Sequence, residues 1–298
     1  MHFIKKIFLS ACAVFFASTC LAQSGLGTSF FDELVSDWHN SFSLEGYGEC
    51  VAKTDIHGAT SGTFQTQRYA ATLKSQSISE SKKHALTAYV QYSRLEADFG
   101  GSYSADAPFD NLDALTTSFF YVYNIERQWS AFAFGSVKFS AENAADWNLG
   151  ATGFVGAGAL YAVSESLSIG FGAAAYSRLS RDWIGIPTVF VQWRITEKLS
   201  LKTFSGATLL YDYFGDGSLV FDTSIEYANT YSRLSDGGVL RDSCWLYGVG
   251  ATWKPAKHFY IGLHVGANFA RELDFKKSDR RNIDADAAPM VFLSVGIL

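Results

Sequence analysis

The residues of this chain that could carry chemistry lie at alternating positions rather than in compact catalytic motifs. His264 and Asn268 share one face of an alternating segment, and His39-Asn40-Ser41 places a histidine beside a serine. An acyl-transfer site needs a serine, a histidine and an orienting polar group held together, but no Gly-x-Ser-x-Gly motif accompanies these residues. We therefore expect no catalytic site and no enzymatic activity, and a lipid hydrolase ranks below the alternatives that follow.

Metal-binding residues also lack the spacing that a metal site needs. The scattered histidines and the acids of one charged loop are His39, His57, His84, His258, His264, Asp279, Asp284 and Asp286. A zinc site needs closely spaced histidines or cysteines, and a calcium loop needs acids at alternating positions around a glycine. We expect no bound metal and no cofactor.

A larger set of polar residues lies on the faces opposite the aliphatic rows of the alternating segments. The set comprises Glu45, Glu49, Arg68, Gln91, Asn124, Lys138, Gln192, Arg194, Lys202, Asp222, Glu226, His264 and Asn268. Charges inside a barrel persist when they are paired or hydrated. The set predicts either a lumen filled by paired charges or a selectivity constriction for small ions and polar solutes, and a narrow interior favours pairing over a wide pore.

The segments that contain these residues alternate between apolar and polar side chains with the period of a β-strand. After Phe259 the aliphatic row contains Ile261, Leu263 and Val265, and the opposite row contains His264 and Asn268. Such segments run for about 10 residues or more, as membrane-crossing strands do, whereas soluble strands average about 5–6. The pattern predicts an all-β fold: a transmembrane, antiparallel, up-and-down β-barrel of 12–14 strands.

A repeated phrase joins these segments. The phrase consists of an aromatic residue, then five residues with turn or charge signals, and then an apolar residue. It occurs as Trp193-Arg-Ile-Thr-Glu-Lys-Leu199 and four further times. The aromatic residues are Tyr123, Tyr161, Trp193, Tyr213 and Trp253. Short turns alternate with long polar connections over 98–113, 235–242 and 271–288, which is typical of periplasmic turns and extracellular loops. We interpret the five rings as a periplasmic aromatic girdle.

The strand number depends on the segment around Gly206. A tight bend there gives fourteen strands, whereas one large outer loop over 213–242 gives twelve. The expected strands are 42–52, 63–74, 84–97, 115–125, 129–140, 149–163, 167–178, 186–196, 199–205, 207–213, 218–232, 243–254, 259–271 and 289–298. Residues 147–164 are uncharged and long enough for a membrane helix, but their four glycines favour a strand.

The first residues predict export. Lys5 and Lys6 precede a short apolar stretch, and Cys20-Leu-Ala22 supplies a cleavage site, so we expect residues 1–22 to be a signal peptide. A lipoprotein-type box at Leu9-Ser-Ala-Cys12 has too few apolar residues before it and ranks lower. Residues 23–40 then form a periplasmic lead, and 41–298 the barrel.

Charge and cysteine content limit the partners. The chain carries 24 basic and 29 acidic residues, a net charge of −5, and loss of the leader makes it more negative. Nothing in this charge attracts nucleic acid. The expected partners are outer-membrane lipids and, during biogenesis, the barrel assembly machinery; the oligomeric state is left open. Cys50 and Cys244 remain after cleavage, and one disulfide or two buried thiols fit equally well.

Residues 115–298 resemble a family of uncharacterised Gram-negative outer-membrane β-barrels that is catalogued as a domain of unknown function. The resemblance lies in Tyr161-Ala-Val-Ser-Glu-Ser-Leu-Ser-Ile-Gly-Phe-Gly, in Ile186-Pro187 followed by the Trp193 phrase, in Tyr231-Ser-Arg-Leu234 and in Trp253-Lys-Pro255. It implies the fold and the outer membrane as compartment, and no chemistry. Two functions then remain open: a narrow channel for small polar solutes or ions, and a structural or adhesive surface barrel.

Overall fold

The fold is a closed antiparallel β-barrel. The computed structural model describes residues 41–298 except 59–60, 80–82, 105–106, 126–127, 143–146, 180 and 204–205. The expected signal peptide (1–22) and periplasmic lead (23–40) therefore lie outside the described residues. Within the described part of the chain, no helix has the length and apolar character needed to cross a membrane.

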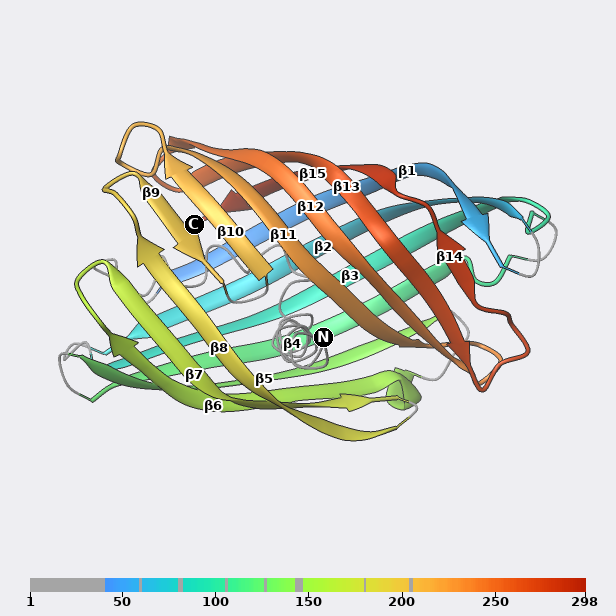
Figure 1. Cartoon of the computed structure of the whole chain (residues 1–298), viewed down its shortest axis with the longest axis horizontal. Coiled ribbons are helices and arrows are strands. Elements are labelled where there is room, and N and C mark those ends of the chain that lie inside the picture. The colour runs from blue at the N-terminus through green and yellow to red at the C-terminus, as the bar shows by residue number, and fades with distance from the viewer. Residues whose placement is uncertain are drawn as a thin grey trace, which may run out of the picture.

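Fourteen strands form the wall, and a fifteenth short strand extends it. The elements are β1 (Ser41–His57), β2 (Gly62–Ile78), β3 (His84–Gly101), β4 (Asn111–Asn124), β5 (Trp129–Glu142), the 3₁₀ helix η1 (Trp147–Gly150), β6 (Ala151–Ala162), β7 (Leu167–Arg178), β8 (Arg181–Arg194), β9 (Leu199–Lys202), β10 (Gly206–Asp212), β11 (Leu219–Arg233), β12 (Val239–Ala256), β13 (Phe259–Lys276), β14 (Ile283–Ala285) and β15 (Ala288–Ile297). Consecutive strands pair along the barrel, and β1 closes it against β15 (Figure 1).

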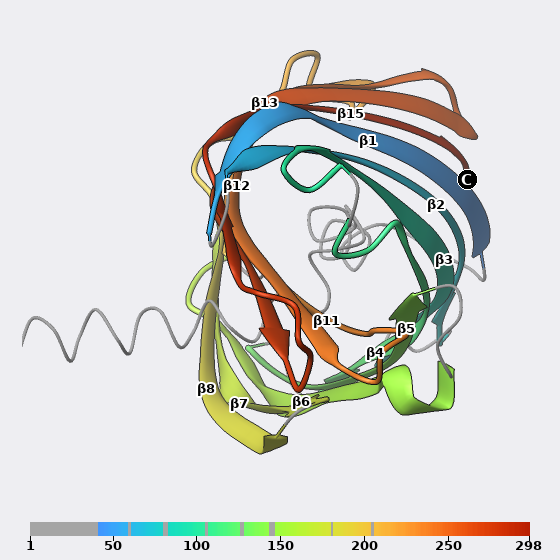
Figure 2. The same cartoon turned by 90° about the vertical axis from the view of Figure 1, so that its right-hand side faces the viewer.

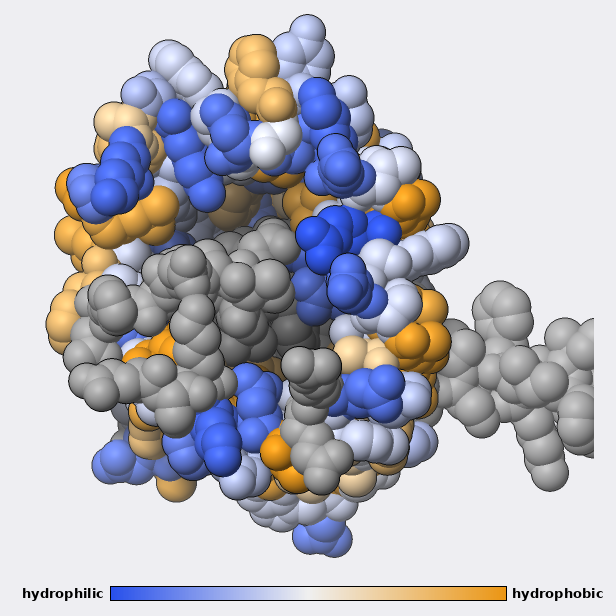
Figure 3. Space-filling model, turned by 90° about the vertical axis from the view of Figure 1, so that its left-hand side faces the viewer, coloured by the Kyte–Doolittle hydropathy of each residue, from blue (hydrophilic) through white to orange (hydrophobic). Residues whose placement is uncertain are grey.

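The two ends of the barrel differ. Short turns join β2–β3, β4–β5, β6–β7, β8–β9, β10–β11 and β12–β13 at one end, which we call the short-turn end. Ser41 pairs with Gln76 at this end, and the Leu298 amide bonds to the His258 carbonyl there. Figure 3 looks onto the short-turn end, where hydrophilic residues surround the rim. The opposite end, which we call the long-loop end, faces the viewer in Figure 2.

The predicted range of 12–14 strands is confirmed, and the structure decides for fourteen. β9 stops at Lys202 and β10 begins at Gly206, so the chain bends where the sequence pattern required, and the twelve-strand alternative is wrong. A Cβ on Gly206 would clash with the backbone of β11, which explains why glycine stands at this close approach. The segment 147–164 is η1 followed by β6, so the strand interpretation holds for all but its first turn.

The loops of the long-loop end are shorter than predicted because the strands continue into them. On β3 the outward residues change from Val90 and Tyr92 to Arg94 and Glu96, while the inward residues become apolar, as at Leu95. The hydrophobic face therefore switches from the outer to the inner side of the wall. A strand end predicted from outward aliphatic residues therefore falls at this switch. The backbone hydrogen bonds between β2 and β3 nevertheless continue to Gly101.

The outer surface carries an apolar band below this switch. Exposed apolar residues alternate along β13 and β15, for example Ile261, Leu263, Val291 and Leu293. The outward row of β13 runs from Phe259 to near the end of the band, about ten residues, which is ~25 Å along the axis of a tilted barrel. This height matches the apolar band of membrane barrels.

Candidate functional site in the barrel interior

Acids and bases gather on one inner wall at mid-height. Glu49 on β1 and Arg68 on β2 are cross-strand partners, with 3.8 Å between Glu49 Oε2 and Arg68 Nη1. Glu226 projects from β11 and interacts electrostatically with both across the interior. Arg68 therefore compensates acidic charge in the interior, whereas Glu49 and Glu226 repel each other.

A second pair spans three strands. His264 Nε2 on β13 lies 2.9 Å from Asp222 Oδ2 on β11, although β12 separates the two strands. Gly250 on β12 is the cross-strand partner of both residues, and a Cβ there would collide with the His264 ring. The glycine thus allows the two side chains to meet over the intervening strand.

The most buried pair was not among the residues expected from sequence. Arg271 Nε and Nη2 donate to both carboxylate oxygens of Asp242 at 3.0 and 2.8 Å, and the two side chains are only 4% and 8% exposed. A bulge opposite Cys244 puts Ala270 in the left-handed region, with φ 51°, and shifts the phase of β13. Residues after Ala270 therefore point inward at odd positions. Alternation counted from Phe259 would place Arg271 outside.

The other expected lumen residues occupy several levels of the interior. Glu45 is half-buried on β1, Lys138 lines a small cavity, and Lys202 is buried at the end of β9. Arg194 lies at the rim of the short-turn end, where its Nη2 donates to the Glu165 carbonyl. The amides Gln91 and Asn268 are buried, Asn124 accepts a hydrogen bond from Ser130, and Gln192 is half-buried.

Aromatic rings encircle the short-turn end on the outer surface. Trp193, Tyr213 and Trp253 are exposed. Tyr123 stacks on His84, with ring centroids 5.1 Å apart, and Tyr161 packs on Trp129 at 4.7 Å. The five residues named in the repeated phrase therefore share one level beside the short turns.

The interior is closed toward the long-loop end. Inward residues of the extended strands form a buried apolar cluster with residues of the loops. This cluster, the outer plug, contains Ile56, Phe64, Leu95, Phe99, Phe109, Leu112, Leu234, Leu240, Leu273, Phe275, Ile283 and Ala285. Beneath it a cavity of about 30 Å³ lies between residues such as Arg68, Gln91 and Asp242. That space holds one or two water molecules and no larger solute.

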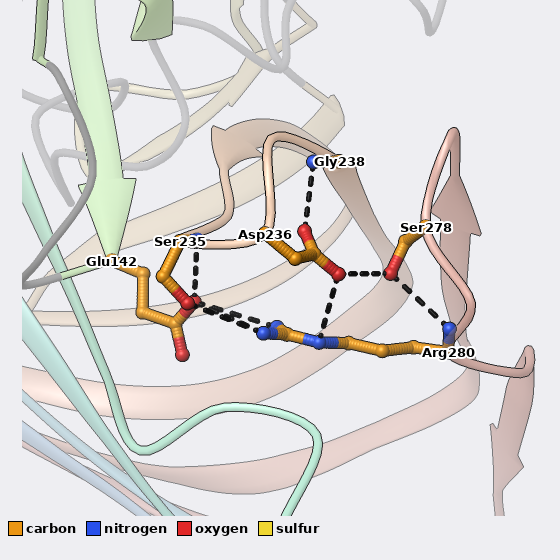
Figure 4. Close-up of polar contacts among 6 residues, drawn as sticks. All are labelled: Glu142, Ser235, Asp236, Gly238, Ser278 and Arg280. Atoms are coloured by element: carbon orange, nitrogen blue, oxygen red, sulfur yellow. Dashed lines mark hydrogen bonds and ion pairs between the residues drawn. The ribbon is translucent and has the colours of Figure 1, made fainter.

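A polar latch holds the loops over the outer plug. Arg280, between β13 and β14, lies 3.4 Å from Glu142 Oε2 on β5 and 3.3 Å from Asp236 Oδ2 in the β11–β12 loop (Figure 4). Burial opposes ionisation of Asp236. Hydrogen bonds from Ser278 and Gly238, together with the Arg280 charge, nevertheless hold the pKa of this carboxyl below its ordinary value of 3.8. Asp236 is therefore ionised at neutral pH and faces the Arg280 guanidinium with its full charge.

The two cysteines among the described residues are free. Cys50 is exposed on β1 and Cys244 is buried on β12. β13 and β15 separate these strands, so the two thiols lie on different parts of the wall, and the structure favours two thiols over a disulfide.

The described residues hold no group of three or more metal-ligating side chains. His264 uses Nε2 toward Asp222, and its buried Nδ1 has no hydrogen-bond partner in the described part of the chain. A serine nucleophile would have to bond to this histidine. The geometry thus describes a paired interior and supplies no assembled acyl-transfer site.

The chain belongs to the family described as Domain of unknown function (DUF6268), whose profile matches residues 68–297. The resemblance found over residues 115–298 is therefore confirmed and extends further toward the N-terminus. No curated protein matches the chain.

Solved structures with similar folds are outer-membrane proteins of low sequence identity. An outer-membrane channel from Pseudomonas putida F1 is 11% identical, with a TM-score of 0.48, covering 88% of this chain and 96% of its own. The toluene transporter TodX from P. putida is 10% identical at 0.48, covering 89% and 90%. A Pseudomonas aeruginosa FadL homologue is 9% identical at 0.44, covering 89% and 91%.

Proposed function

We propose that this protein is an outer-membrane β-barrel that passes small polar solutes or ions along its charged inner wall, with the outer plug shut in the present structure. The observation that supports this proposal is the set of paired acids and bases along the inner wall, formed by Glu49–Arg68, Asp222–His264 and Asp242–Arg271. An interior built only to stabilise the barrel has no need of buried charges, because apolar packing is often as stable.

The orientation follows from the two ends. The short-turn end carries short turns and both ends of the barrel chain, and these features support a periplasmic position for it. The long-loop end, with the latch, then faces outward. A tag inserted at Glu197, in the β8–β9 turn, should be hidden in intact cells, and a tag at Asp279 should be accessible. The reverse labelling would overturn the orientation.

Conductance in a planar bilayer tests the channel. Wild-type protein should show rare, small steps, because among the described residues the outer plug packs across the long-loop end and the cavity beneath it measures only about 30 Å³. Arg280→Ala removes both contacts of the latch and should raise the fraction of time spent open. Replacing Asp222 and Glu226 together by Asn and Gln should change the ion preference of these steps.

One observation favours a second function. The outer plug is a well-packed apolar core, with Phe99 and Phe109 in edge-to-face contact at 5.4 Å, and such a core suits a permanently closed barrel. A structural or adhesive surface barrel needs no path for solutes through its interior. If wild-type and Arg280→Ala protein both fold, by heat-modifiable mobility on a gel, and both stay silent in the bilayer, the channel proposal fails and this alternative stands.

A further inference from the structure

The cavity beneath the outer plug lies where two opposite walls of the barrel meet. β11 contacts β5 through a parallel bridge between Arg233 and Ala141, and the hydroxyls of Ser232 and Ser140 lie 2.7 Å apart there (Figure 2). The strands β2–β5 line one side of the cavity, and β11 and β12 line the other. Residues that are far apart in the sheet therefore face one another across a space of about 30 Å³.

Hydroxyl groups supply hydrogen-bond donors to this space from both sides. Ser93, Thr116 and Thr230 line the cavity, and within the described residues their hydroxyls have no hydrogen-bond partner. Ser140 and Ser232 bond to each other, so one of their two hydroxyl hydrogens is left over. Unpaired polar hydrogens at a buried position need an acceptor. An acceptor placed in the cavity would pair with several of them at once.

Arg68 brings a positive charge to the same space. Its side chain is 18% exposed, and its Nη1 lies 3.8 Å from Glu49 Oε2, which is longer than a hydrogen bond. In the part of the chain that the structure describes, the Arg68 guanidinium donates no hydrogen bond, although it carries five N–H groups. Lys138 is a second base in the lining. Donors of this kind bond most strongly to an acceptor that carries a negative charge.

The acid of the lining is already paired. Asp242 accepts hydrogen bonds from Arg271 on both carboxylate oxygens, at 3.0 and 2.8 Å. Glu49 and Glu226 interact electrostatically with Arg68 but are not among the residues that line the cavity. The surface of the cavity thus presents donors and basic groups, and its carboxylate is held by another arginine.

We infer that the cavity binds one monatomic anion of the size of chloride, between Arg68 and the hydroxyls of Thr116 and Thr230. Space for one or two water molecules admits a single chloride ion, whereas sulfate, phosphate and carboxylate anions are too large. A water molecule in the same position would accept hydrogen bonds but leave the Arg68 charge without a hydrogen-bonded counter-ion. The bound anion links β2 and β4 to β11, and this role is independent of ion conduction.

Bromide tests the site directly, because it replaces chloride and can be located by its anomalous X-ray scattering. Crystals of the protein grown in sodium gluconate and soaked in sodium bromide should show an anomalous peak between Arg68 and Thr116. Crystals soaked in sodium sulfate should show no sulfate there. Density without an anomalous signal would mean that water alone fills the cavity and would overturn the inference.

Thermal unfolding in detergent micelles separates a built site from an adventitious ion. At constant ionic strength, replacing gluconate by bromide should raise the unfolding midpoint until the site is saturated, because the anion binds the folded state. Equal midpoints in the two salts would mean an adventitious ion only, bound at crystal concentration, and would also overturn the inference.

Two threonine variants provide a matched comparison. Thr116→Val removes one donor of the cavity and should weaken the apparent bromide affinity roughly tenfold, the effect of one hydrogen bond to a charged group. Thr188→Val is the control: Thr188 is 8% exposed on β8, its Oγ1 has no partner within the described residues, and it does not line the cavity. Its bromide response should equal that of the wild type. Equal weakening in both variants would contradict the site, and Ser93→Ala replaces Thr116→Val if that variant does not fold.

Discussion

Replacing Arg271 by methionine removes a base that is only 4% exposed while keeping a side chain of similar length. The guanidinium donates to both oxygens of Asp242, and its Nη1 lies 3.3 Å from Thr66 Oγ1. Its central carbon lies 4.8 Å from the centroid of the Phe64 ring. Methionine preserves most of the contact with Phe64. The loss is therefore mainly electrostatic.

The expected magnitude follows from the burial of the partner. Asp242 would be left as a carboxylate that is 8% exposed and has lost its counter-charge. Breaking a buried pair on one side costs about 3–5 kcal/mol. Asp242→Asn should lower the free energy of unfolding by a similar amount, because it leaves the buried Arg271 guanidinium without its carboxylate partner. The double variant should be destabilised by at least about 1.5 kcal/mol less than the sum of the two, because both charges are then gone.

Urea unfolding in detergent micelles, followed by tryptophan fluorescence, measures these differences. Arg94→Met is the matched control: Arg94 is 36% exposed on the outer face and lies 3.2 Å from Glu96, which is 47% exposed, and such a pair contributes about 0–1 kcal/mol. The more buried Asp113, 3.7 Å from Arg94, keeps its hydrogen bond from the Tyr92 hydroxyl in this variant. A loss at Arg271 no larger than at Arg94, or additive single losses, would refute both the bulge-determined inward direction of Arg271 and the pairing argument.

Three further outcomes follow from the faces and the latch. Ile225→Lys should destabilise the barrel folded in lipid vesicles by about 2–4 kcal/mol, because a base on the lipid side is costly near the midplane. Asp222→Asn should fold like the wild type. The opposite result would mean that Ile225 points inward and Asp222 faces lipid. Trp253→Ala should slow insertion into lipid, measured by tryptophan fluorescence. If the folding yield is unchanged and the conductance is altered instead, the Trp253 ring lies inside the barrel and the prediction is wrong. The lowered pKa of Asp236 means that its ionised form stabilises the latch above the ordinary pKa of 3.8 and that this stabilisation is lost as pH falls through the lower folded value. Protease protection of the β11–β12 loop should therefore persist to about pH 4 and vanish in stronger acid, and loss already near pH 6 would contradict the assignment.

Period-two alternation and the repeated turn phrase were sufficient to predict the barrel and a count of twelve or fourteen strands, and the structure decided for fourteen. Both signals are local. A strand with one lipid face must alternate, and a short hairpin must carry turn residues beside its last aromatic. For the same reason Asp222 and Glu226 could be placed inside from the neighbours Phe221 and Ile225 alone.

Three features depended on contacts between distant segments. The inward direction of Arg271 follows from a single left-handed residue, Ala270, because one extra residue in a strand exchanges its faces. In the strand extensions that form the outer plug, apolar residues point inward and polar residues point outward, the reverse of the lipid-facing part of each strand. In the sequence these extensions therefore resemble polar loops. The bridge between Arg233 and Ala141 joins strands six apart in chain order. Which walls of a barrel touch is decided by how the whole sheet closes, and no local pattern of residues encodes that.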